Sequence, residues 1–154
     1  MDYEIRDAKH DDGDAMLALM PRLADFDVPA SRDPRDLYRH DAELLRRWIE
    51  GKETCLVQVA VTKEQAVLGL SMVRLRPELL SDQPSAHLEA IAVSHHAEGK
   101  GIAKALLDAA ERAAAAHGAL TMTLHVFANN NRARGFYDRL GYSGELMRYI
   151  KDIV

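Results

Sequence analysis

The stretch Glu98-Gly99-Lys100-Gly101-Ile102-Ala103-Lys104 decides how this chain is interpreted. It follows an apolar run, Leu88 to Val93, that is typical of a buried strand, and it opens an amphipathic helix. Because no Ser, Thr or Asp stands at the start of that helix, up to four backbone N–H groups lack partners and carry roughly half a positive charge. Glycine lets another group approach the backbone closely. We therefore expect this turn to bind an anion, and a phosphate is the usual one.

The residues around the turn predict a mixed α/β sheet. Residues 86–93, 101–117 and 120–127 predict a strand, a helix and a second strand, and such a βαβ unit has parallel strands. Upstream, the β-rich runs 54–61 and 66–76 flank a polar turn and predict an antiparallel hairpin. The other predicted elements are an edge strand at 3–6, a helix around 15–19 that Pro21 kinks or ends, helices at 34–50 and 129–139, and a last strand at 147–150. We expect helices on both faces of the sheet and one domain over residues 1–154.

Composition restricts the classes of function. The 154-residue chain has a net charge of −4 at pH 7 and a pI of about 6.0, and this weak acidity argues against a nucleic-acid partner. No apolar run approaches the length of a membrane span, and the polar, acidic first residues are unlike a signal peptide. Cys55 is the only cysteine and lies in an apolar run, so we interpret it as a small buried residue in a reducing compartment. We therefore expect a cytoplasmic protein with no membrane partner.

A second motif follows the predicted strand 120–127 and reads Asn130-Asn131-Arg132-Ala133-Arg134-Gly135-Phe136-Tyr137-Asp138-Arg139-Leu140-Gly141-Tyr142. The glycine turn by itself matches neither the dinucleotide-binding fingerprint nor the P-loop. Taken together, the two motifs resemble those of the GNAT superfamily of acetyl-CoA-dependent N-acetyltransferases. That family has Arg/Gln-x-x-Gly-x-Gly/Ala at the turn and Asn-x-x-Ala-x-x-aromatic/Leu-Tyr-x-x-x-Gly-Phe/Tyr later, in the same order and spacing. Glu98 departs from the pattern, because the family usually has Arg or Gln at that position.

The resemblance implies a GNAT-type fold, with a central mixed sheet of six to seven strands flanked by about four helices. It implies that backbone amides of the turn hold the pyrophosphate of acetyl-CoA and that the preceding strand pairs with the pantetheine arm. It also implies that Tyr137 protonates the departing thiolate. The implied cofactor-binding residues are Ile91, Ala92, Val93, Glu98, Gly99, Lys100, Gly101, Ile102, Ala103, Lys104, Asn130, Ala133 and Tyr137.

An amine acceptor makes a base necessary. At pH 7 an alkylamine with a pKa near 10.4 is neutral in only about one molecule in a thousand, and deprotonating it costs roughly 4–5 kcal/mol. Glu89 is our candidate base, because a charge in the middle of a predicted strand is costly without a purpose and because the family often has a glutamate near this position. His87, on the same strand face, and His125, on the neighbouring strand, are the other candidates, and the alternative for all three is a purely structural role.

These observations predict transfer of an acetyl group from acetyl-CoA to a primary amine of a small molecule. We expect direct attack, because Cys55 lies far in sequence from both motifs. The acceptor pocket is expected from residues 20–40 and 77–85, where acidic residues attract a cationic amine. Those acids are Asp25, Asp27, Asp33 and Asp36.

Two alternatives stay open at this point, namely a protein or peptide acceptor and a sensor domain that binds acyl-CoA without turnover. A homodimer is a further expectation from the resemblance. We expect no metal site, because His95 and His96 lack a third ligand at a suitable spacing.

Overall fold

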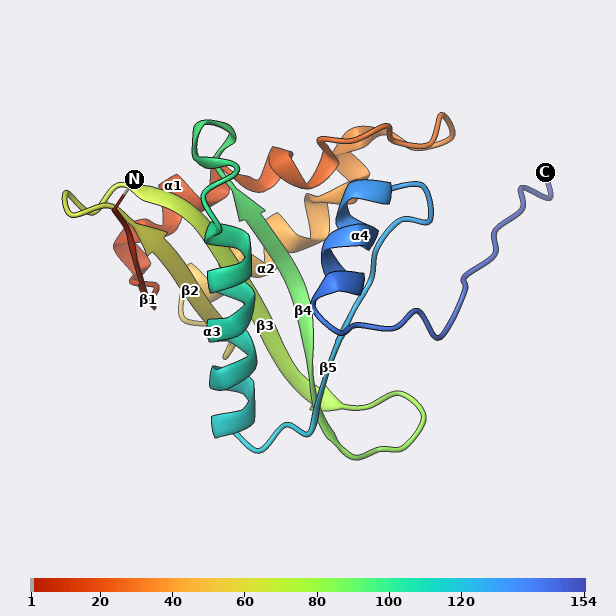
Figure 1. The fold of residues 1–154 in the computed structure, drawn as a ribbon. Coiled ribbons are helices and arrows are strands. Elements are labelled where there is room, and N and C mark those ends of the chain that lie inside the picture. The colour runs from red at the N-terminus through yellow and green to blue at the C-terminus, as the bar shows by residue number, and fades with distance from the viewer. Residues whose placement is uncertain (1) are drawn as a thin grey trace.

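The computed structural model describes residues 2–154, and one mixed sheet of five strands in the order β1-β2-β3-β4-β5 lies at its centre (Figure 1). The strands are β1 (Glu4–Asp7), β2 (Leu56–Val61), β3 (Val67–Pro77), β4 (Pro84–Val93) and β5 (Thr121–Leu124). The α-helices are α1 (Gly13–Leu17), α2 (Arg39–Ile49), α3 (Ile102–Ala116) and α4 (Asn131–Arg139). Short 3-10 helices are η1 (His10–Asp12), η2 (Met20–Ala24), η3 (Pro34–Leu37) and η4 (His95–Ala97).

Strands β1 to β4 pair with one another in antiparallel fashion, which confirms the predicted hairpin between β2 and β3. Strand β2 shows why the sequence folds this way, because its side chains alternate between the two sheet faces. Val57 and Val59 pack into the core that Met16 and Leu45 share, whereas Ala60 packs on the opposite face. Each face of the sheet therefore carries its own apolar core.

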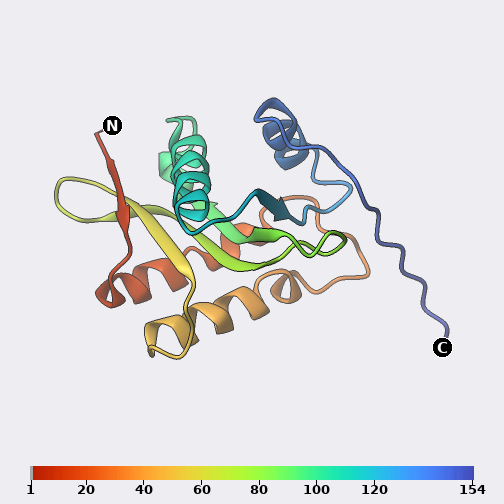
Figure 2. The ribbon, with the colours of Figure 1, turned by 90° about the horizontal axis from the view of Figure 1, so that it is seen from below.

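Helices cover both faces of the sheet. Figure 2 shows α1 and α2 on one side and α3 and α4 on the other. The α3 side buries Leu106 and Leu107, and the α1–α2 side buries Leu45, with all three side chains fully buried. The predicted arrangement of a mixed sheet between helical layers is confirmed.

The last two strands are parallel, as predicted, but they pair over a short length. Strand β4 pairs with β5 from Ser85 opposite Thr121 to Leu88 opposite Leu124, and no further. The predicted strand 120–127 therefore ends at Leu124, where β5 diverges from β4. The part of β4 after Leu88 keeps its pairing with β3 and leaves its other edge open, among the residues that the structure describes.

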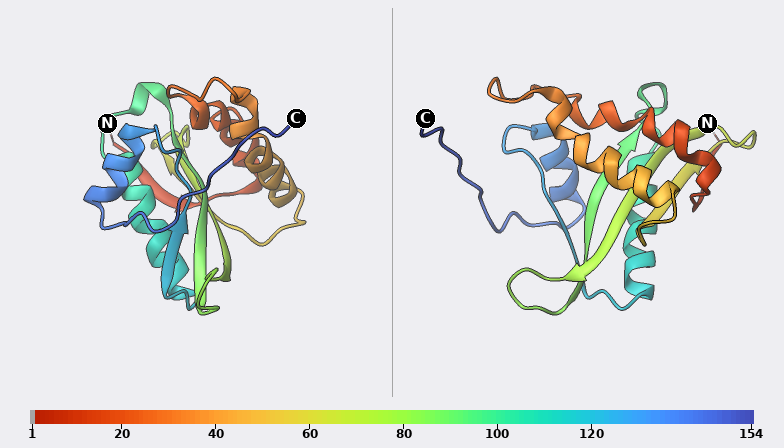
Figure 3. Two further views of the ribbon diagram at one scale, coloured as in Figure 1. Left: turned by 90° about the vertical axis from the view of Figure 1, so that its right-hand side faces the viewer. Right: turned by 180° about the vertical axis from the view of Figure 1, so that it is seen from behind.

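The number of strands is the main correction to the predicted fold. The sheet has five strands instead of six to seven, and the predicted strand 147–150 does not form. Residues 143–154 run as an extended, exposed tail, because no strand of the same chain pairs with them in the part that the structure describes (Figure 3). Within residues 2–154, no helix has both the length and the apolar character needed to span a membrane.

Candidate acetyl-transfer site

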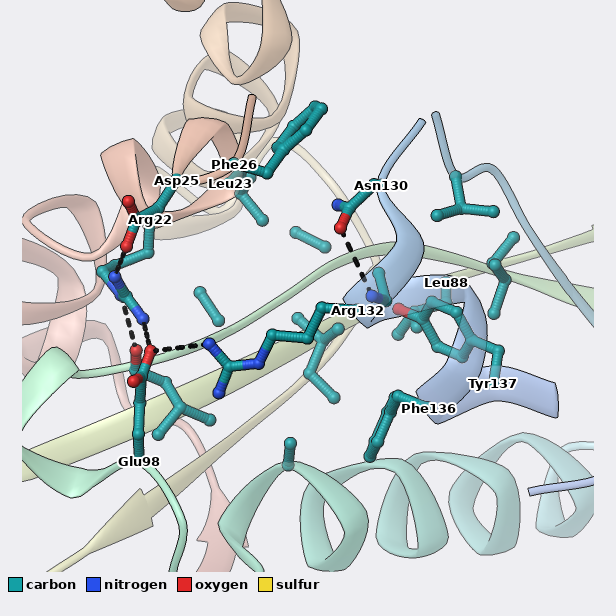
Figure 4. A pocket seen from close by; sticks show the side chains of 18 of the residues that line it. Arg22, Leu23, Asp25, Phe26, Leu88, Glu98, Asn130, Arg132, Phe136 and Tyr137 are labelled. Atoms are coloured by element: carbon teal, nitrogen blue, oxygen red, sulfur yellow. Dashed lines mark hydrogen bonds and ion pairs between the residues drawn. The ribbon is translucent and has the colours of Figure 1, made fainter. Parts of the chain in front are cut away.

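A cavity of about 510 Å³ opens where β4 and β5 diverge. The first turn of α3, the outer edge of β4, the end of β5, helix α4 and the segment around η2 all contribute to its walls (Figure 4). Its lining includes most of the residues that the two sequence motifs single out. These are Glu89, Ile91, Ala92, Val93, Glu98, Gly99, Gly101, Ile102, Ala103, Lys104, Asn130, Ala133 and Tyr137.

The glycine turn forms one end of the cavity. Gly99 and Gly101 have φ of +73° and +77°, a conformation that other residues adopt only with strain, and a Cβ at either glycine would meet nothing within 4 Å. Gly101 is the N-cap of α3, and no side chain caps this helix. The first N–H groups of α3 are therefore left for a ligand, as the sequence predicts. Lys100, by contrast, is not among the residues that line the cavity.

Glu98 lies between two arginines that come from opposite walls. Its carboxylate accepts a hydrogen bond from Arg22 of η2, and Arg132 of α4 approaches the same oxygen at 3.7 Å (Figure 4). Arg22 also pairs with Asp25 and donates from Nε to the carbonyl of Val93 at 3.0 Å. The negative charge that departs from the GNAT pattern is therefore balanced by two cations.

His95 completes a small group of oxygen and nitrogen donors with Asp25 and Glu98. The guanidinium of Arg22 contacts all three, with its Nη1 at 3.3 Å from Nδ1 of His95. Because Arg22 and Arg132 together balance the charges of the two carboxylates, we assign this group a structural role.

Strand β4 brings Glu89 to the cavity through a β-bulge. Met72 pairs with Ala90 and Val73 pairs with Leu88, so Glu89 is the extra residue on β4. The bulge changes which side chains face which helices. Leu88 packs on the α3 side, whereas Ala90 packs on the α1–α2 side.

Asp41 of α2 is a second carboxylate at the cavity, and it has no counterpart in the sequence-based prediction. Burial is the main cause that raises the pKa of Asp41 to about 7, and the neighbouring Glu89 carboxylate adds to the shift. Two carboxylates of the same sign thus share one end of the cavity, and a cation there would relieve their repulsion.

His87 and His125 lie next to each other and differ in their surroundings. Nδ1 of the buried His87 lies 2.7 Å from the hydroxyl oxygen of Thr123, and the His87 and His125 rings are 4.7 Å apart. Burial, followed by the charges of Arg76 and His125, lowers the pKa of His87 to about 4. His87 is therefore neutral at pH 7 and a weak base, and His125 is the one of the two that lines the cavity.

Helix α4 supplies Tyr137 and Asn130. The Tyr137 ring packs against those of Phe136 and Tyr142, and its hydroxyl points into the cavity (Figure 4). Burial raises the pKa of Tyr137 to about 12, so the hydroxyl keeps its proton throughout the neutral pH range. Asn130 is the N-cap of α4 and accepts through Oδ1 from the N–H of Ala133 at 3.3 Å, which leaves its amide group to donate.

Two segments that line the cavity contact each other. The Phe26 and Phe127 rings pack 5.5 Å apart, and Asn129 Nδ2 donates to the carbonyl of Asp27 at 2.6 Å. The segment after η2 and the segment after β5 are therefore tied together over the cavity.

Of the two segments predicted to form the acceptor pocket, 20–40 contributes residues to this cavity and 77–85 does not. Arg22, Leu23, Asp25, Phe26 and Leu37 line the cavity, whereas no residue of the 77–85 loop does so within the described chain. That loop connects the far ends of β3 and β4, at the opposite end of the sheet from the glycine turn (Figure 1).

The acids proposed to attract an amine are also mostly occupied. Asp25 pairs with Arg22, Asp33 with Arg35 and Asp36 with Arg39. The backbone carbonyl of Asp27 accepts the hydrogen bond from Asn129 described above. Asp41 and Glu89 are two further acids that line the cavity.

Comparisons with known proteins match both the sequence and the fold. The sequence model of the acetyltransferase (GNAT) family matches residues 20–142. The uncharacterized N-acetyltransferase YycN of Bacillus subtilis is 33% identical over 79 residues, which is 51% of this chain and 49% of that protein. The chain thus spans about half the length of this relative.

Two solved structures share the fold over their whole length. A candidate acetyl transferase of Pyrococcus furiosus has a TM-score of 0.80 at 24% identity, covering 99% of this chain and 100% of that one. Glucosamine-6-phosphate N-acetyltransferase of Arabidopsis thaliana has a TM-score of 0.68 at 17% identity, covering 100% of both chains. At these identities, the likeness concerns the fold alone.

Proposed function

Because the chain belongs to the GNAT family of acetyltransferases, we propose that it transfers an acetyl group from acetyl-CoA to a primary amine of a small molecule. One observation carries the proposal. A single cavity joins an uncapped glycine turn, the open edge of β4, the carboxylates of Asp41 and Glu89 and the half-buried Tyr137.

The residues of the turn fit the phosphates of acetyl-CoA. No atom lies within 4 Å of where a Cβ would stand on Gly99 or Gly101, so a pyrophosphate has room against the backbone there. The N-terminus of α3 favours its negative charge. Arg132, which lines the cavity at this end, adds a cation. The carboxylate of Glu98 opposes a phosphate, but its pairing with Arg22 and Arg132 reduces that effect.

The open edge of β4 suits an extended ligand chain. From Glu89 to Val93, backbone groups on the β5 side have no strand partner within residues 2–154, because β5 ends at Leu124. Such unpaired backbone groups form hydrogen bonds with an extended, amide-containing arm of a ligand in the same way as with an added β-strand. A backbone N–H on this edge also suits a carbonyl oxygen that gains negative charge during acyl transfer.

Three side chains divide the proton chemistry. When bound, acetyl-CoA supplies the thioester carbonyl that the amine attacks. Glu89 accepts the proton that the acceptor ammonium loses, directly or through water, and Asp41 helps to hold the cation before that loss. The Tyr137 hydroxyl donates a hydrogen bond toward the departing sulfur. Because burial raises its pKa to about 12, well above the ~8.5 of a thiol, hydrogen bonding is the main part of this role and full proton transfer is secondary.

A small acceptor agrees with the covered end of the cavity. The Phe26–Phe127 contact and the Asn129–Asp27 hydrogen bond cross the region where a peptide would have to lie. One solved structure of similar fold is named glucosamine-6-phosphate N-acetyltransferase, and by that name it acts on a small amine. This agrees with a small acceptor for the present chain.

A panel of acceptors tests the proposal. Purified protein is incubated with acetyl-CoA and polyamines, amino acids, aminoglycosides or short peptides, and the acetylated product is detected by mass. Product from a small amine supports the proposal, and product from peptides alone replaces it with protein acetylation. Acetyl-CoA binding without product from any member would favour a sensor domain.

A further inference from the structure

Helix α4 carries Tyr137 but buries none of its own nine residues completely. It lies on the same side of the sheet as α3 (Figure 2). Phe136, Tyr137 and the following Leu140 are half-buried and pack against the core on that side. Because a helix in a protein gains most of its stability from the apolar face that it buries, α4 depends more than the other helices on polar contacts near its ends.

A polar contact joins α4 to the body of the protein near each end. At the N-terminal end, Arg132 lies 3.7 Å from the carboxylate of Glu98. Beyond the C-terminal end, the hydroxyl of Tyr142 donates a hydrogen bond of 2.6 Å to Oε2 of Glu111 in α3. A hydrogen bond to a carboxylate is shorter and about twice as strong as one between neutral groups. The Tyr142–Glu111 hydrogen bond therefore fixes the end of α4 that lies nearer to Tyr137.

Tyr142 connects this hydrogen bond to Tyr137. The N–H of Tyr142 donates to the carbonyl of Tyr137 at 3.0 Å, and the two rings lie 5.7 Å apart, edge to face. Burial, followed by the hydrogen bond to Glu111, raises the pKa of Tyr142, so its hydroxyl keeps the proton that it donates at neutral pH. The Tyr137 ring thus contacts a side chain whose own position is set by Glu111.

We propose that Glu111 is a positioning residue for acetyl transfer, and that it acts through Tyr142 on the place of the Tyr137 hydroxyl. Glu111 is not among the residues that line the cavity, so its effect passes through another side chain. The inference rests on the proposed function, because it concerns the hydroxyl that meets the departing sulfur. A reacting group misplaced by about 1 Å can cost up to about 100-fold in rate, so loss of this hydrogen bond should appear in kcat.

Cofactor binding depends on the opposite end of α4. Arg132 and the glycine turn lie there, and five residues separate Arg132 from Tyr137 in sequence, which is about 7–8 Å along a helix. Glu98 still pairs with Arg132 when the Tyr142–Glu111 hydrogen bond is lost. We therefore expect kcat to fall while the dissociation constant of acetyl-CoA stays the same.

Four variants test the positioning role with a small amine that the wild type acetylates. Tyr142→Phe removes only the hydroxyl, and Glu111→Leu removes its acceptor; each should lower kcat about 10-fold at saturating acetyl-CoA. Glu111→Gln keeps an acceptor oxygen and should retain most of the rate. Arg112→Leu changes the neighbouring, exposed charge on α3 and should match the wild type.

The Tyr137→Phe background separates positioning from general support of the fold. Without the Tyr137 hydroxyl there is nothing left to misplace, so adding Tyr142→Phe should lower kcat no further. An equal loss in both backgrounds would overturn the inference, and so would wild-type kcat in Tyr142→Phe. A wild-type chain that acetylates no acceptor would remove the proposed function itself and this inference with it.

Hydrogen exchange followed by mass spectrometry supplies a readout that needs no substrate. Backbone amides of residues 131–139 should exchange faster in Tyr142→Phe and Glu111→Leu than in the wild type, Glu111→Gln or Arg112→Leu, because α4 opens more often when its end is released. Equal exchange in all five proteins would show that the Tyr142–Glu111 hydrogen bond does not hold α4, and would overturn the inference whether or not the chain is active.

Discussion

Replacing Gly101 by alanine separates the glycine turn's structural role from its role in binding. Gly101 has φ of +77°, where a Cβ costs about 1–2 kcal/mol. For a chain of this size, that cost lowers the melting temperature by about 2–8 °C. The added methyl group itself clashes with nothing, because no atom lies within 4 Å of its position. The folded protein therefore survives the change.

The methyl group occupies the space that we assign to a phosphate. Losing one hydrogen bond between a backbone N–H and a charged oxygen costs about 1.5–3 kcal/mol. At about 1.4 kcal/mol for each factor of ten, acetyl-CoA binding weakens about 10- to 150-fold. Isothermal titration calorimetry with acetyl-CoA, well below the melting temperature, measures the change directly.

Gly118 provides the matched control at the other end of α3. Its φ is +90°, and a Cβ there also meets nothing within 4 Å. Gly118→Ala is therefore expected to lose a similar amount of stability while binding acetyl-CoA like the wild type. Equal affinities for Gly101→Ala, Gly118→Ala and wild type would refute the assignment of the turn as the phosphate site.

Three further substitutions test the remaining groups. Glu98→Gln removes the charge that competes with phosphates for Arg132. Because an ion pair near the surface contributes ~0.5–1 kcal/mol, acetyl-CoA should bind about 2- to 5-fold more tightly. A weaker complex in calorimetry would show that Glu98 instead positions the arginines. Glu89→Gln should lower kcat/KM for the amine about 100-fold or more without changing the dissociation constant of acetyl-CoA, and near wild-type rates would remove Glu89 as the base. Asp41 has a folded-state pKa raised to about 7, above the ~3.9 of an unfolded chain, so its contribution to stability falls as pH rises between these values. Asp41→Asn should therefore raise the melting temperature at pH 8 more than at pH 5, whereas Glu43→Gln, exposed on the same helix, should show no such difference.

The motifs of the sequence predict the uncapped glycine turn well, because backbone conformation there follows from local residue type. Gly99 and Gly101 adopt positive φ, and Asn130 caps α4. The part of the cavity around Phe26 and Asp41 depends on contacts between distant segments, and the sequence predicted fewer of the residues that line it. Asp41 lies at helical spacing from Leu37 and Leu45, a signal for a buried carboxylate on α2, yet only the folded chain brings it beside Glu89.

Two features of the sheet were not predictable from residue pattern alone. The bulge at Glu89 interrupts an ordinary apolar run and is set by the pairing of β4 with β3. The tail has the composition of a strand, and the prediction of a strand at 147–150 follows from it. A strand also needs a neighbour, and within a single copy residues 143–154 have none among the residues described.

The rate of acetyl transfer in Tyr137→Phe tests the central claim most directly. The substitution removes only the hydroxyl that points into the cavity, and the remaining ring keeps its packing against Phe136 and Tyr142. With a small amine that the wild type acetylates, and with saturating acetyl-CoA, we predict that kcat falls about 100-fold while the dissociation constant of acetyl-CoA is unchanged. Mass detection of the acetylated amine avoids any signal from Cys55. Turnover equal to that of the wild type would contradict the account, because the thiol would then leave without any contribution from the Tyr137 hydroxyl.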